Sequence, residues 1–261
     1  MRIATWNVNS VRARLERLSG WLSEARPDVV LLQETKCQDE QFPREPLEEL
    51  GYQSAHFGQK TYNGVAILAR QRIEGVELGL GDERFDGVRF NPEARVISAQ
   101  VGEYLVASVY AINGQEVGQP RYHDKLAWYA SLRAWLAERF PLSEKVVVGG
   151  DLNVTRDDLD VHDPRAWHEK ILCSTPERAA LGAVLGLGYA DGLRHFHPAG
   201  GVYTWWDFRT RAFERGNKGL RIDYLLLSPP ALAECSAVEV DLDARRGAKP
   251  SDHAPVVATL A

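Results

Sequence analysis

Short runs of apolar residues alternate along this chain with longer stretches in which apolar positions recur at helical spacing. The short runs are typical of buried β-strands and the longer stretches of amphipathic helices. The predicted strands cover residues 3–6, 29–32, 64–70, 94–101, 104–110, 146–148, 222–228, 235–241 and 254–260. The predicted helices follow Ser10 or occupy residues 121–139 and 176–186. The pattern therefore predicts many short strands with a few helices.

Local signals support the predicted helices. One face of the first helix carries four apolar residues, Leu15, Leu18, Trp21 and Leu22. We expect Ser10 to cap this helix, because a serine hydroxyl accepts a hydrogen bond from a backbone N–H in the first turn. Pro27 is expected to end it. The sequence Ser174-Thr175-Pro176 is a good start signal for the helix over residues 176–186.

No linker, low-complexity tract or shift in composition divides the chain, so we expect a single domain over residues 1–261. Short apolar strands, hairpin signals and a few long helices favour a layered α/β sandwich. The first half opens with a strand, a helix and a strand that ends at Glu34. A strand that ends at Asp151 follows in the second half, which indicates a repeated plan.

Polar residues stand together at the ends of five predicted strands. These segments are Trp6-Asn7-Val8-Asn9, Gln33-Glu34-Thr35-Lys36, Gly149-Gly150-Asp151-Leu152-Asn153, Arg221-Ile222-Asp223-Tyr224 and Ser251-Asp252-His253. Because strand interiors are buried and apolar, a carboxylate or amide at the end of a strand needs a partner or a function. Carboxylates, amides and one imidazole suit an oxygen-ligated metal and an activated water. We therefore expect one site assembled from many strand ends.

Composition narrows the class of protein. The 261 residues are 44% hydrophobic and 26% charged, as in ordinary globular proteins. No apolar run approaches about 18 residues, so we expect no membrane-spanning helix. A predicted strand begins within three residues of Met1, so we expect no signal peptide. Because Cys37, Cys173 and Cys235 form neither a disulfide framework nor a zinc motif, we expect a cytoplasmic protein.

Charge is distributed unevenly. The net charge of −5 argues against a polyanionic partner, but screening over about 8 Å makes local charge more important than the sum. Two basic stretches stand out, Arg209, Arg211, Arg215, Lys218 and Arg221 in the first, and Arg245, Arg246 and Lys249 in the second. Stacking rings at Trp205 and Trp206 before the first stretch suit a nucleic acid. The alternatives are a solvated surface and a buried aromatic cluster.

Two segments carry carboxylates that suit phosphate chemistry. Glu34 follows four apolar residues and can bind Mg²⁺, unless it only pairs with Lys36 at the surface. Asp151 and Asn153 face the same way on an extended chain. Asp151 can orient or deprotonate a water, and Asn153 can donate to a phosphoryl oxygen. The alternative for this segment is an ordinary Asx turn.

Asp223 and His253 are the predicted acid–imidazole pair. Asp223 begins a buried strand and needs a partner, and a carboxylate on one ring nitrogen favours the charged imidazole. The alternative for His253 is a turn residue before Pro255. We expect the other histidines on the surface or in helices: His56, His123, His162, His168, His195 and His197.

The polar segments extend into five motifs, Trp6-Asn7-Val8-Asn9-Ser10-Val11-Arg12-Ala13, Leu32-Gln33-Glu34-Thr35-Lys36, Gly150-Asp151-Leu152-Asn153, Arg221-Ile222-Asp223-Tyr224 and Ser251-Asp252-His253-Ala254-Pro255-Val256. In this order they resemble the exonuclease III family of abasic-site endonucleases, and the whole chain is similar to its bacterial branch. The resemblance implies a four-layered α/β/β/α sandwich of the DNase I-like superfamily, with two mixed β-sheets packed face to face between flanking helices.

The resemblance also implies a function. It predicts a metal-dependent DNA repair nuclease that hydrolyses the phosphodiester 5′ to an abasic site in duplex DNA, with 3′→5′ exonuclease and 3′-phosphatase activity. It implies Mg²⁺ as the cofactor, with Mn²⁺ as a substitute. The implied partner is duplex DNA with abasic sites or 3′ ends, bound by a monomeric enzyme without a membrane partner.

The roles that the resemblance implies are assigned residue by residue. The implied metal ligands are Asn7, Glu34, Asp151, Asn153, Asp252 and His253. The implied catalytic residues are Tyr110, Asp151, Asn153, Asp223 and His253. Asp151 orients or activates the water, Asn153 and Tyr110 stabilise phosphoryl oxygens, and His253 contacts the scissile phosphate. The implied DNA-binding residues are Arg12, Lys36, Asn113, Trp205, Arg211, Arg215, Leu220 and Ile222. Trp205, Leu220 and Ile222 are expected to wall the pocket for the abasic sugar.

Two departures and two alternatives accompany this interpretation. Ile112 stands where the family commonly has proline, and Trp205 is larger than the phenylalanine of some relatives. One alternative is another phosphoesterase of the same fold, acting on inositol phosphates or sphingolipid head groups, which would not need the basic–aromatic segment. The other is a non-catalytic nucleic-acid-binding regulator, which should lack Glu34, Asp151 or His253.

Overall fold

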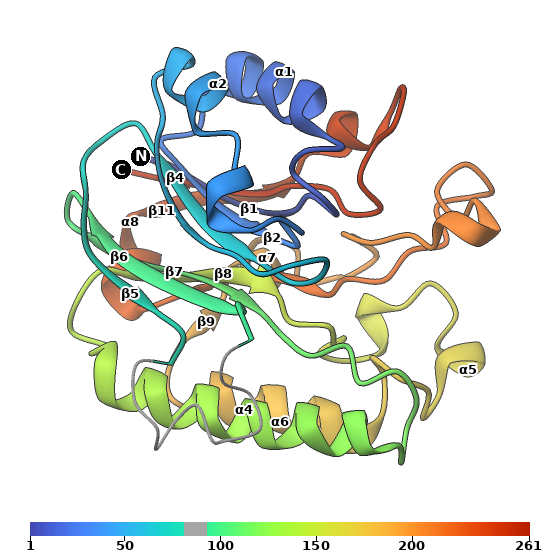
Figure 1. Cartoon of the computed structure of the whole chain (residues 1–261). Coiled ribbons are helices and arrows are strands. Elements are labelled where there is room, and N and C mark those ends of the chain that lie inside the picture. Colours follow the sequence, from blue (N-terminus) through green and yellow to red (C-terminus); the bar gives the residue numbers. More distant parts are fainter. Residues whose placement is uncertain (81–92) are drawn as a thin grey trace.

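Two six-stranded β-sheets pack face to face in the computed structural model of the protein, which describes residues 1–80 and 93–261 (Figure 1). The first sheet has the order β11 (Cys235–Val240), β12 (Val256–Leu260), β1 (Arg2–Asn7), β2 (Val29–Gln33), β4 (Val65–Ala69) and β3 (Gln53–Phe57). The second has the order β5 (Ile73–Leu78), β6 (Val96–Val101), β7 (Tyr104–Tyr110), β8 (Val146–Asp151), β10 (Asp223–Leu227) and β9 (Ala190–Asp191).

Helices cover both outer faces. The first sheet is covered by α1 (Leu15–Ala25) and α2 (Arg44–Glu49), and the second by α4 (Pro120–Arg139) and α6 (Thr175–Leu185) (Figure 1). The shorter helices are α5 (Pro164–Trp167), α7 (Gly192–Phe196), α8 (Pro229–Glu234), η1 (Asp39–Gln41), η2 (Asp158–Asp160), η3 (Phe208–Thr210) and η4 (Leu242–Arg245). The predicted four-layered sandwich is confirmed. None of the helices in the described ranges is long and apolar enough to span a bilayer.

Three apolar layers hold the sandwich together because side chains alternate across each strand. In β1, Ile3 packs between the two sheets, whereas Ala4 and Trp6 pack beneath α1. The third layer lies between the second sheet and α4, where Trp128 and Trp135 are buried. Strands with both faces covered are apolar throughout, which explains why β2 and β8 are evident in the sequence as continuous apolar runs.

The start of the first helix differs from the prediction. Helix α1 begins at Leu15 after Arg14, which makes no side-chain capping bond. Ser10 Oγ instead accepts a hydrogen bond from Ala13 N at 3.3 Å, in the turn that precedes the helix. The reason is that Ser10 N donates to the carbonyl of Glu34 at 2.7 Å, which ties this turn to the end of β2. The expected cap on α1 was therefore wrong.

The two sheets have the same order of parallel and antiparallel strand pairs. In the first, β1 and β2 are parallel neighbours joined through α1, and in the second, β7 and β8 are parallel neighbours joined through α4. The outer strands correspond as well, since an antiparallel pair flanks each parallel pair on both sides. The expected repeat is thus present, and the counterpart of the β1–α1–β2 unit is β7–α4–β8.

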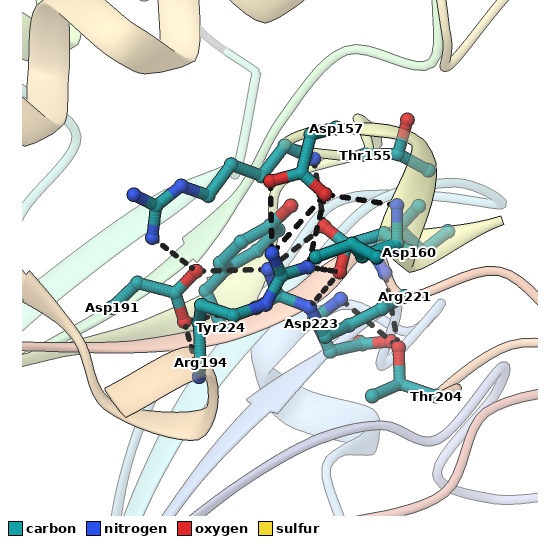
Figure 2. Close-up of polar contacts among 12 residues, drawn as sticks. Thr155, Asp157, Asp160, Asp191, Arg194, Thr204, Arg221, Asp223 and Tyr224 are labelled. Carbon is teal, nitrogen blue, oxygen red and sulfur yellow. Dashed lines mark hydrogen bonds and ion pairs between the residues drawn. The ribbon is translucent and has the colours of Figure 1, made fainter. Parts of the chain in front are cut away.

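A buried ionic cluster fixes the segment that enters β10 (Figure 2). The guanidinium group of Arg221 donates to Asp160 at 2.7 and 2.8 Å and to Asp191 at 2.8 and 2.8 Å. It also lies 4.5 Å from the ring centroid of Tyr224. Arg194 extends the cluster by pairing with Asp160. Arg221 is therefore buried and structural, and its expected place in an exposed basic stretch was wrong.

The same segment is held from its other side by Thr204. Its hydroxyl oxygen accepts hydrogen bonds from the backbone N–H groups of Ile222 and Asp223, both at 3.1 Å. Asp223 then pairs with Asp151 across the antiparallel β8–β10 ladder. The ionic cluster and Thr204 together position the first residue of β10 at the edge of the sheet where β8 ends.

We expect Arg221→Met to lower the free energy of unfolding by about 3–5 kcal/mol, because it leaves buried carboxylates without their main partner. Urea denaturation of the two proteins measures this difference. Arg209→Met is the matched control, since that side chain is 94% exposed and its loss should change the free energy by less than about 0.5 kcal/mol. Equal losses in the two variants would contradict a structural role for Arg221.

Candidate active site

Strand ends from both sheets meet at one edge of the sandwich. In the parallel registers Asn7 lies beside Gln33, and Tyr110 lies beside Asp151. Glu34 follows β2 directly. The sequence-predicted residues that are distant in the chain are therefore brought together by strand pairing and by the packing of one sheet on the other.

Asn7 links carboxylates from the two sheets. Its Nδ2 group donates to Glu34 Oε1 at 2.8 Å and to Asp151 Oδ2 at 2.9 Å. Its side-chain oxygen accepts from Asn9 N at 3.0 Å. Both polar atoms of the buried Asn7 amide are thus engaged by protein groups. This geometry makes Asn7 a support for the two carboxylates.

Glu34 is charged although it is largely buried. Burial opposes its ionisation, but the Lys36 ammonium and the Asn7 amide lower the pKa of Glu34 overall. Lys36 Nζ lies 2.7 Å from Glu34 Oε2. The pairing with Lys36, which was one of the two interpretations of this residue, is therefore present within the site and not out on the surface. It leaves Glu34 able to act as an anionic oxygen ligand.

Three side chains form a group that could hold a metal ion. Ligand atoms of Glu34, Asp151 and His253 all lie within 4.8 Å of one another. Two carboxylates are the hard oxygen donors that Mg²⁺ requires. Asp252, another predicted ligand, lies outside this group and accepts from Asn9 Nδ2 at 2.8 Å and from Trp205 Nε1 at 3.2 Å. The donor set fits a divalent cation.

Asp223 holds His253 as expected. His253 Nδ1 lies 2.9 Å from Asp223 Oδ2, and His253 Nε2 lies 3.7 Å from Asp151 Oδ2. Burial disfavours the charged ring, but the Asp223 and Asp151 carboxylates outweigh it and raise the pKa of His253 to about 10. An imidazolium has no lone pair to offer a cation, so the metal-ligand and phosphate-contact roles of His253 exclude each other in any one state.

Asp151 is an unusually basic carboxylate. Burial raises the pKa of Asp151 to about 7, and the neighbouring Asp223 and Glu34 carboxylates add to this rise, although His253 opposes it. A group with a pKa near the working pH is suited to proton transfer. Tyr110 differs, because burial and the nearby Glu34 raise its pKa well above the usual range and keep it a phenol that can donate.

The loops after β7 and β8 present amide groups. Asn113 Nδ2 donates to Asn153 Oδ1 at 2.9 Å, and Asn153 Nδ2 donates one proton to the carbonyl of Ala111 at 3.0 Å. The second Nδ2 proton of Asn153 can serve a phosphoryl oxygen. Ile112, the departure noted in the sequence, is buried and directly precedes Asn113. The direct contact between Asn113 and Asn153 was not predicted from the sequence.

Sequence reasoning missed Lys125, whose buried ammonium group supports the main chain of both loops. Its ammonium group pairs with Glu177 and donates to the carbonyls of Asn153 at 2.5 Å and Asn113 at 3.2 Å. Both charged side chains are fully buried. The only sequence signal was a lysine beside the apolar face of a predicted helix, which by itself has no specific meaning.

An apolar cluster lies beside His253, because Trp205 forms a β-bridge with that residue. Leu220 and Ile222 pack with Val161 and Leu172, and Trp205 lies against them. Trp167 stands edge-on to Trp205, with ring centroids 6.4 Å apart. Of the three predicted pocket residues, Leu220 and Ile222 are buried, and Trp205 retains exposed surface. Trp206 is fully buried, in agreement with the alternative that it belongs to the core.

The basic stretches divide into exposed and buried arginines. Arg209, Arg211, Arg215 and Lys218 are exposed in the segment that projects beside α5 in Figure 1, and Arg12 is exposed in the turn before α1. Arg245 is buried instead, with its guanidinium 5.0 Å from the ring centroids of Phe208 and Phe213. Its expected place in an exposed basic stretch was wrong, because its stem and charge are covered by the aromatic residues that follow Trp206.

The structure corrects one more prediction. His56, which was expected on the surface or in a helix, is buried in strand β3 and contacts Thr35 and Asp39. Thr35, the residue that His56 contacts, directly follows Glu34 in the chain.

Comparisons with known proteins agree with this geometry. The sequence profile of the Endonuclease/Exonuclease/phosphatase family matches residues 4–253. The chain is 34% identical over 269 aligned positions to exodeoxyribonuclease III of Haemophilus influenzae, and the alignment covers 98% of each protein.

Solved structures are similar over the whole chain. The 3′-5′ exonuclease NExo from Neisseria meningitidis is 41% identical, with a TM-score of 0.95, and the match covers 100% of this chain and 99% of that one. A structure of the 3′ phosphatase NExo from Neisseria, bound to a product DNA hairpin, is 40% identical, with the same score and the same coverage of the two chains. An AP endonuclease from Archaeoglobus fulgidus is 34% identical, with a TM-score of 0.94 and coverage of 100% and 99%.

Because the pKa of Asp151 is raised, we expect metal binding to release protons and to depend on pH. At about pH 7 this carboxyl is partly protonated, and a cation bound beside it favours the anion. Binding of Mg²⁺ should therefore release about half a proton per ion, and its affinity should increase from about pH 6 to about pH 8. Calorimetry in buffers of different ionisation enthalpy measures this release.

Asp151→Asn is the control for this measurement, because it removes the proton in question. Any heat that remains in that variant should be the same in all buffers. A buffer-independent heat in the unaltered protein would show that Asp151 is already ionised before the cation binds.

Proposed function

The chain belongs to the endonuclease/exonuclease/phosphatase family, and on this basis we propose that it is a Mg²⁺-dependent DNA repair nuclease. It hydrolyses the phosphodiester 5′ to an abasic site in duplex DNA and also processes 3′ ends. The observation that carries the proposal is the convergence of Glu34, Asp151 and His253 within 4.8 Å. The monomeric state and the cytoplasmic location expected from the sequence stay predictions.

The proposed reaction is the attack of water on a phosphorus atom, with departure of the deoxyribose 3′ oxygen. Asp151 orients the water and takes its proton, for which its raised pKa suits it. His253, held as a cation by Asp223, neutralises charge on a non-bridging oxygen. Asn153 and Tyr110 donate to the same phosphoryl group. A cation held by Glu34 and Asp151 would add electrostatic stabilisation of the transition state.

Substrate selection is proposed to lie in the neighbouring surfaces. Trp205 offers a flat face beside the phosphate-binding groups, and it packs on Leu220 and Ile222 at the position expected for an abasic sugar. Arg12, Arg211 and Arg215 are exposed cations, and we propose that they contact the phosphates on either side. Lys36 would serve both the site and the DNA, because its ammonium group already pairs with Glu34.

Similar structures support activity on 3′ ends as well as on abasic sites. Two of the structures reported above are named as a 3′-5′ exonuclease and a 3′ phosphatase, and a third as an AP endonuclease. The names with the higher identity, 41% and 40%, refer to 3′ ends. We therefore propose 3′-end processing as an activity of equal standing with abasic-site cleavage.

Four substrates test the proposal in one experiment. They are a duplex with one tetrahydrofuran abasic analogue and the intact duplex, both blocked at their 3′ ends, a nick with a 3′ phosphate and a recessed 3′ end, each with Mg²⁺ or with EDTA. We expect Mg²⁺-dependent conversion of the abasic or 3′-end substrates and an intact control duplex. Hydrolysis of inositol phosphates in a parallel assay, with no conversion of these DNA substrates, would favour the other phosphoesterase, and tight DNA binding without cleavage would favour the regulator.

Asp151→Asn should lower kcat on the preferred substrate by about 10²–10⁴-fold, because water activation belongs to the transition state. The dissociation constant for the same DNA should change by less than about threefold. Single-turnover kinetics and fluorescence anisotropy measure the two quantities. A collapse of affinity together with rate would assign Asp151 to substrate binding.

Arg211→Ala and Arg215→Ala should each weaken DNA binding regardless of sequence. Each lost phosphate contact should reduce the slope of log affinity against log salt by about 0.9. Arg72→Ala is the control, because its side chain is 81% exposed at the end of β4 that pairs with the start of β2, opposite the site. An unchanged slope in the first two variants would show that these arginines do not contact DNA phosphates.

A further inference from the structure

The residues that follow β2 adopt a strained backbone at the metal-binding edge. Glu34 and Lys36 both have φ of 52°, in the left-handed region that residues other than glycine rarely occupy. Such conformations persist where the surrounding structure fixes them, and they cluster at functional sites. The residue between them, Thr35, is fully buried. Its surroundings therefore decide how the Glu34 carboxylate is aimed.

Backbone hydrogen bonds fix the two flanks of this turn. Thr35 N donates to the carbonyl of Gly64 at 3.1 Å, and Lys36 N donates to the carbonyl of Asn63 at 2.9 Å. On the other flank, the carbonyls of Glu34 and Thr35 accept from the turn that precedes α1. These bonds hold the main chain, and they leave the buried Thr35 hydroxyl to be satisfied from elsewhere.

His56 satisfies the Thr35 hydroxyl. Its Nε2 lies 2.8 Å from Thr35 Oγ1, and its Nδ1 lies 2.7 Å from Asp39 Oδ1. The ring is stacked on Phe42, with centroids 4.2 Å apart and planes 22° apart. Burial lowers the pKa of His56 to about 4, although Asp39 opposes this, so the ring is neutral at neutral pH. In the tautomer that carries its proton on Nδ1, on the side of Asp39, Nε2 can accept a hydrogen bond from the Thr35 hydroxyl.

The surrounding backbone is shaped to this contact. A Cβ atom on Gly64 would lie 2.0 Å from Thr35 Oγ1, and a Cβ atom on Gly58 would lie 2.3 Å from His56 Cε1. Gly58 N also donates to Asp39 Oδ1 at 2.9 Å. Both glycines therefore allow the main chain to close on the two side chains without a gap. The contact has little freedom to shift.

The order aspartate, histidine and hydroxyl also occurs in enzymes with a serine or threonine nucleophile. Here Thr35 is 0% exposed and the side chain of His56 is 0% exposed. No substrate can reach the hydroxyl without disrupting the turn. The arrangement therefore acts on its neighbours and does not perform chemistry of its own.

We propose that His56, held by Asp39, is a positioning residue that aims the Glu34 carboxylate at the metal site through the hydroxyl of Thr35. The inference rests on the proposed metal-dependent function. Residues that orient a metal ligand from behind affect metal affinity by about 10–100-fold when they are changed. His56 and Thr35 should have this effect although neither side chain touches the metal or the DNA.

Two matched substitutions of Thr35 isolate the hydroxyl. Thr35→Val has nearly the same shape without the donor, and Thr35→Ser keeps it. We expect Thr35→Val to raise the Mg²⁺ or Mn²⁺ concentration for half-saturation by about tenfold. Thr35→Ser should remain within about twofold, because the hydrogen bond to His56 is retained. Calorimetric titration of the DNA-free protein with each ion measures this without relying on activity.

His56→Phe tests the other end of the contact. It keeps the stacking on Phe42 and removes the ring nitrogens, so we expect the same tenfold change as in Thr35→Val. Because both variants break the same Thr35–His56 hydrogen bond, the double variant should bind the metal ion no more weakly than either single variant does. Asp39→Ala, at a side chain that is 48% exposed, should give a smaller shift of about threefold. This last variant is expected to fold even if the buried ones do not.

Ser228→Ala controls for a general loss of stability. Ser228 is buried, and its hydroxyl donates to the carbonyl of Glu144 beyond the opposite end of β10. It should lower the thermal midpoint as Thr35→Val does, without changing the metal titration. In the kinetic assay, Thr35→Val should lower kcat at limiting Mg²⁺ and leave KM for DNA unchanged.

The outcomes separate the two proposals. Absence of metal binding and cleavage in the unaltered protein would overturn the proposed function. Normal binding in the unaltered protein, with the same half-saturation in Thr35→Val, His56→Phe and Asp39→Ala, would overturn the positioning role alone.

Discussion

The structure depends on balancing several buried negative charges at one edge of the sandwich. Glu34, Asp151 and Asp223 approach one another where water is largely excluded, and their mutual repulsion would be costly without compensation. The Asn7 amide joins two of the carboxylates, Lys36 pairs with the first, and the His253 ring bridges the other two. The remaining excess of negative charge is what prepares this edge for a cation.

The fold produces this concentration through its repeated connectivity. A parallel pair joined by a helix occurs once in each sheet, as β1–α1–β2 and β7–α4–β8. The carboxyl ends of the four strands carry Asn7, Gln33, Tyr110 and Asp151. Packing one sheet on the other brings these ends together, so the site belongs to neither half alone. This follows the general tendency of α/β sheets to place sites at the carboxyl ends of parallel strands.

Buried polar contacts behind the site then set its geometry. Arg221 fixes the entry to β10, Lys125 holds the two loops that carry Asn113 and Asn153, and the Thr35–His56 contact holds the turn at Glu34. Each of these side chains is buried and each reaches residues far away in the sequence. A hydrolytic site needs this support because an error of about 1 Å in a reacting group can reduce the rate by about 10²-fold.

The sequence alone determined the layered fold, most of the long elements and the residues that assemble at the site. The reason is that buried strands and the polar residues at their ends can be recognised within short segments of the sequence. It did not reveal that Arg221 and Arg245 are buried, since the partners of Arg221 lie 61 and 30 positions away and a run of basic residues looks the same whether paired or exposed. Ser10, His56 and Lys125 acquire their contacts only when β2, β3 and the loop after β8 come together. Charge pairing and side-chain burial depend on through-space distance, which only the packing of the two sheets decides.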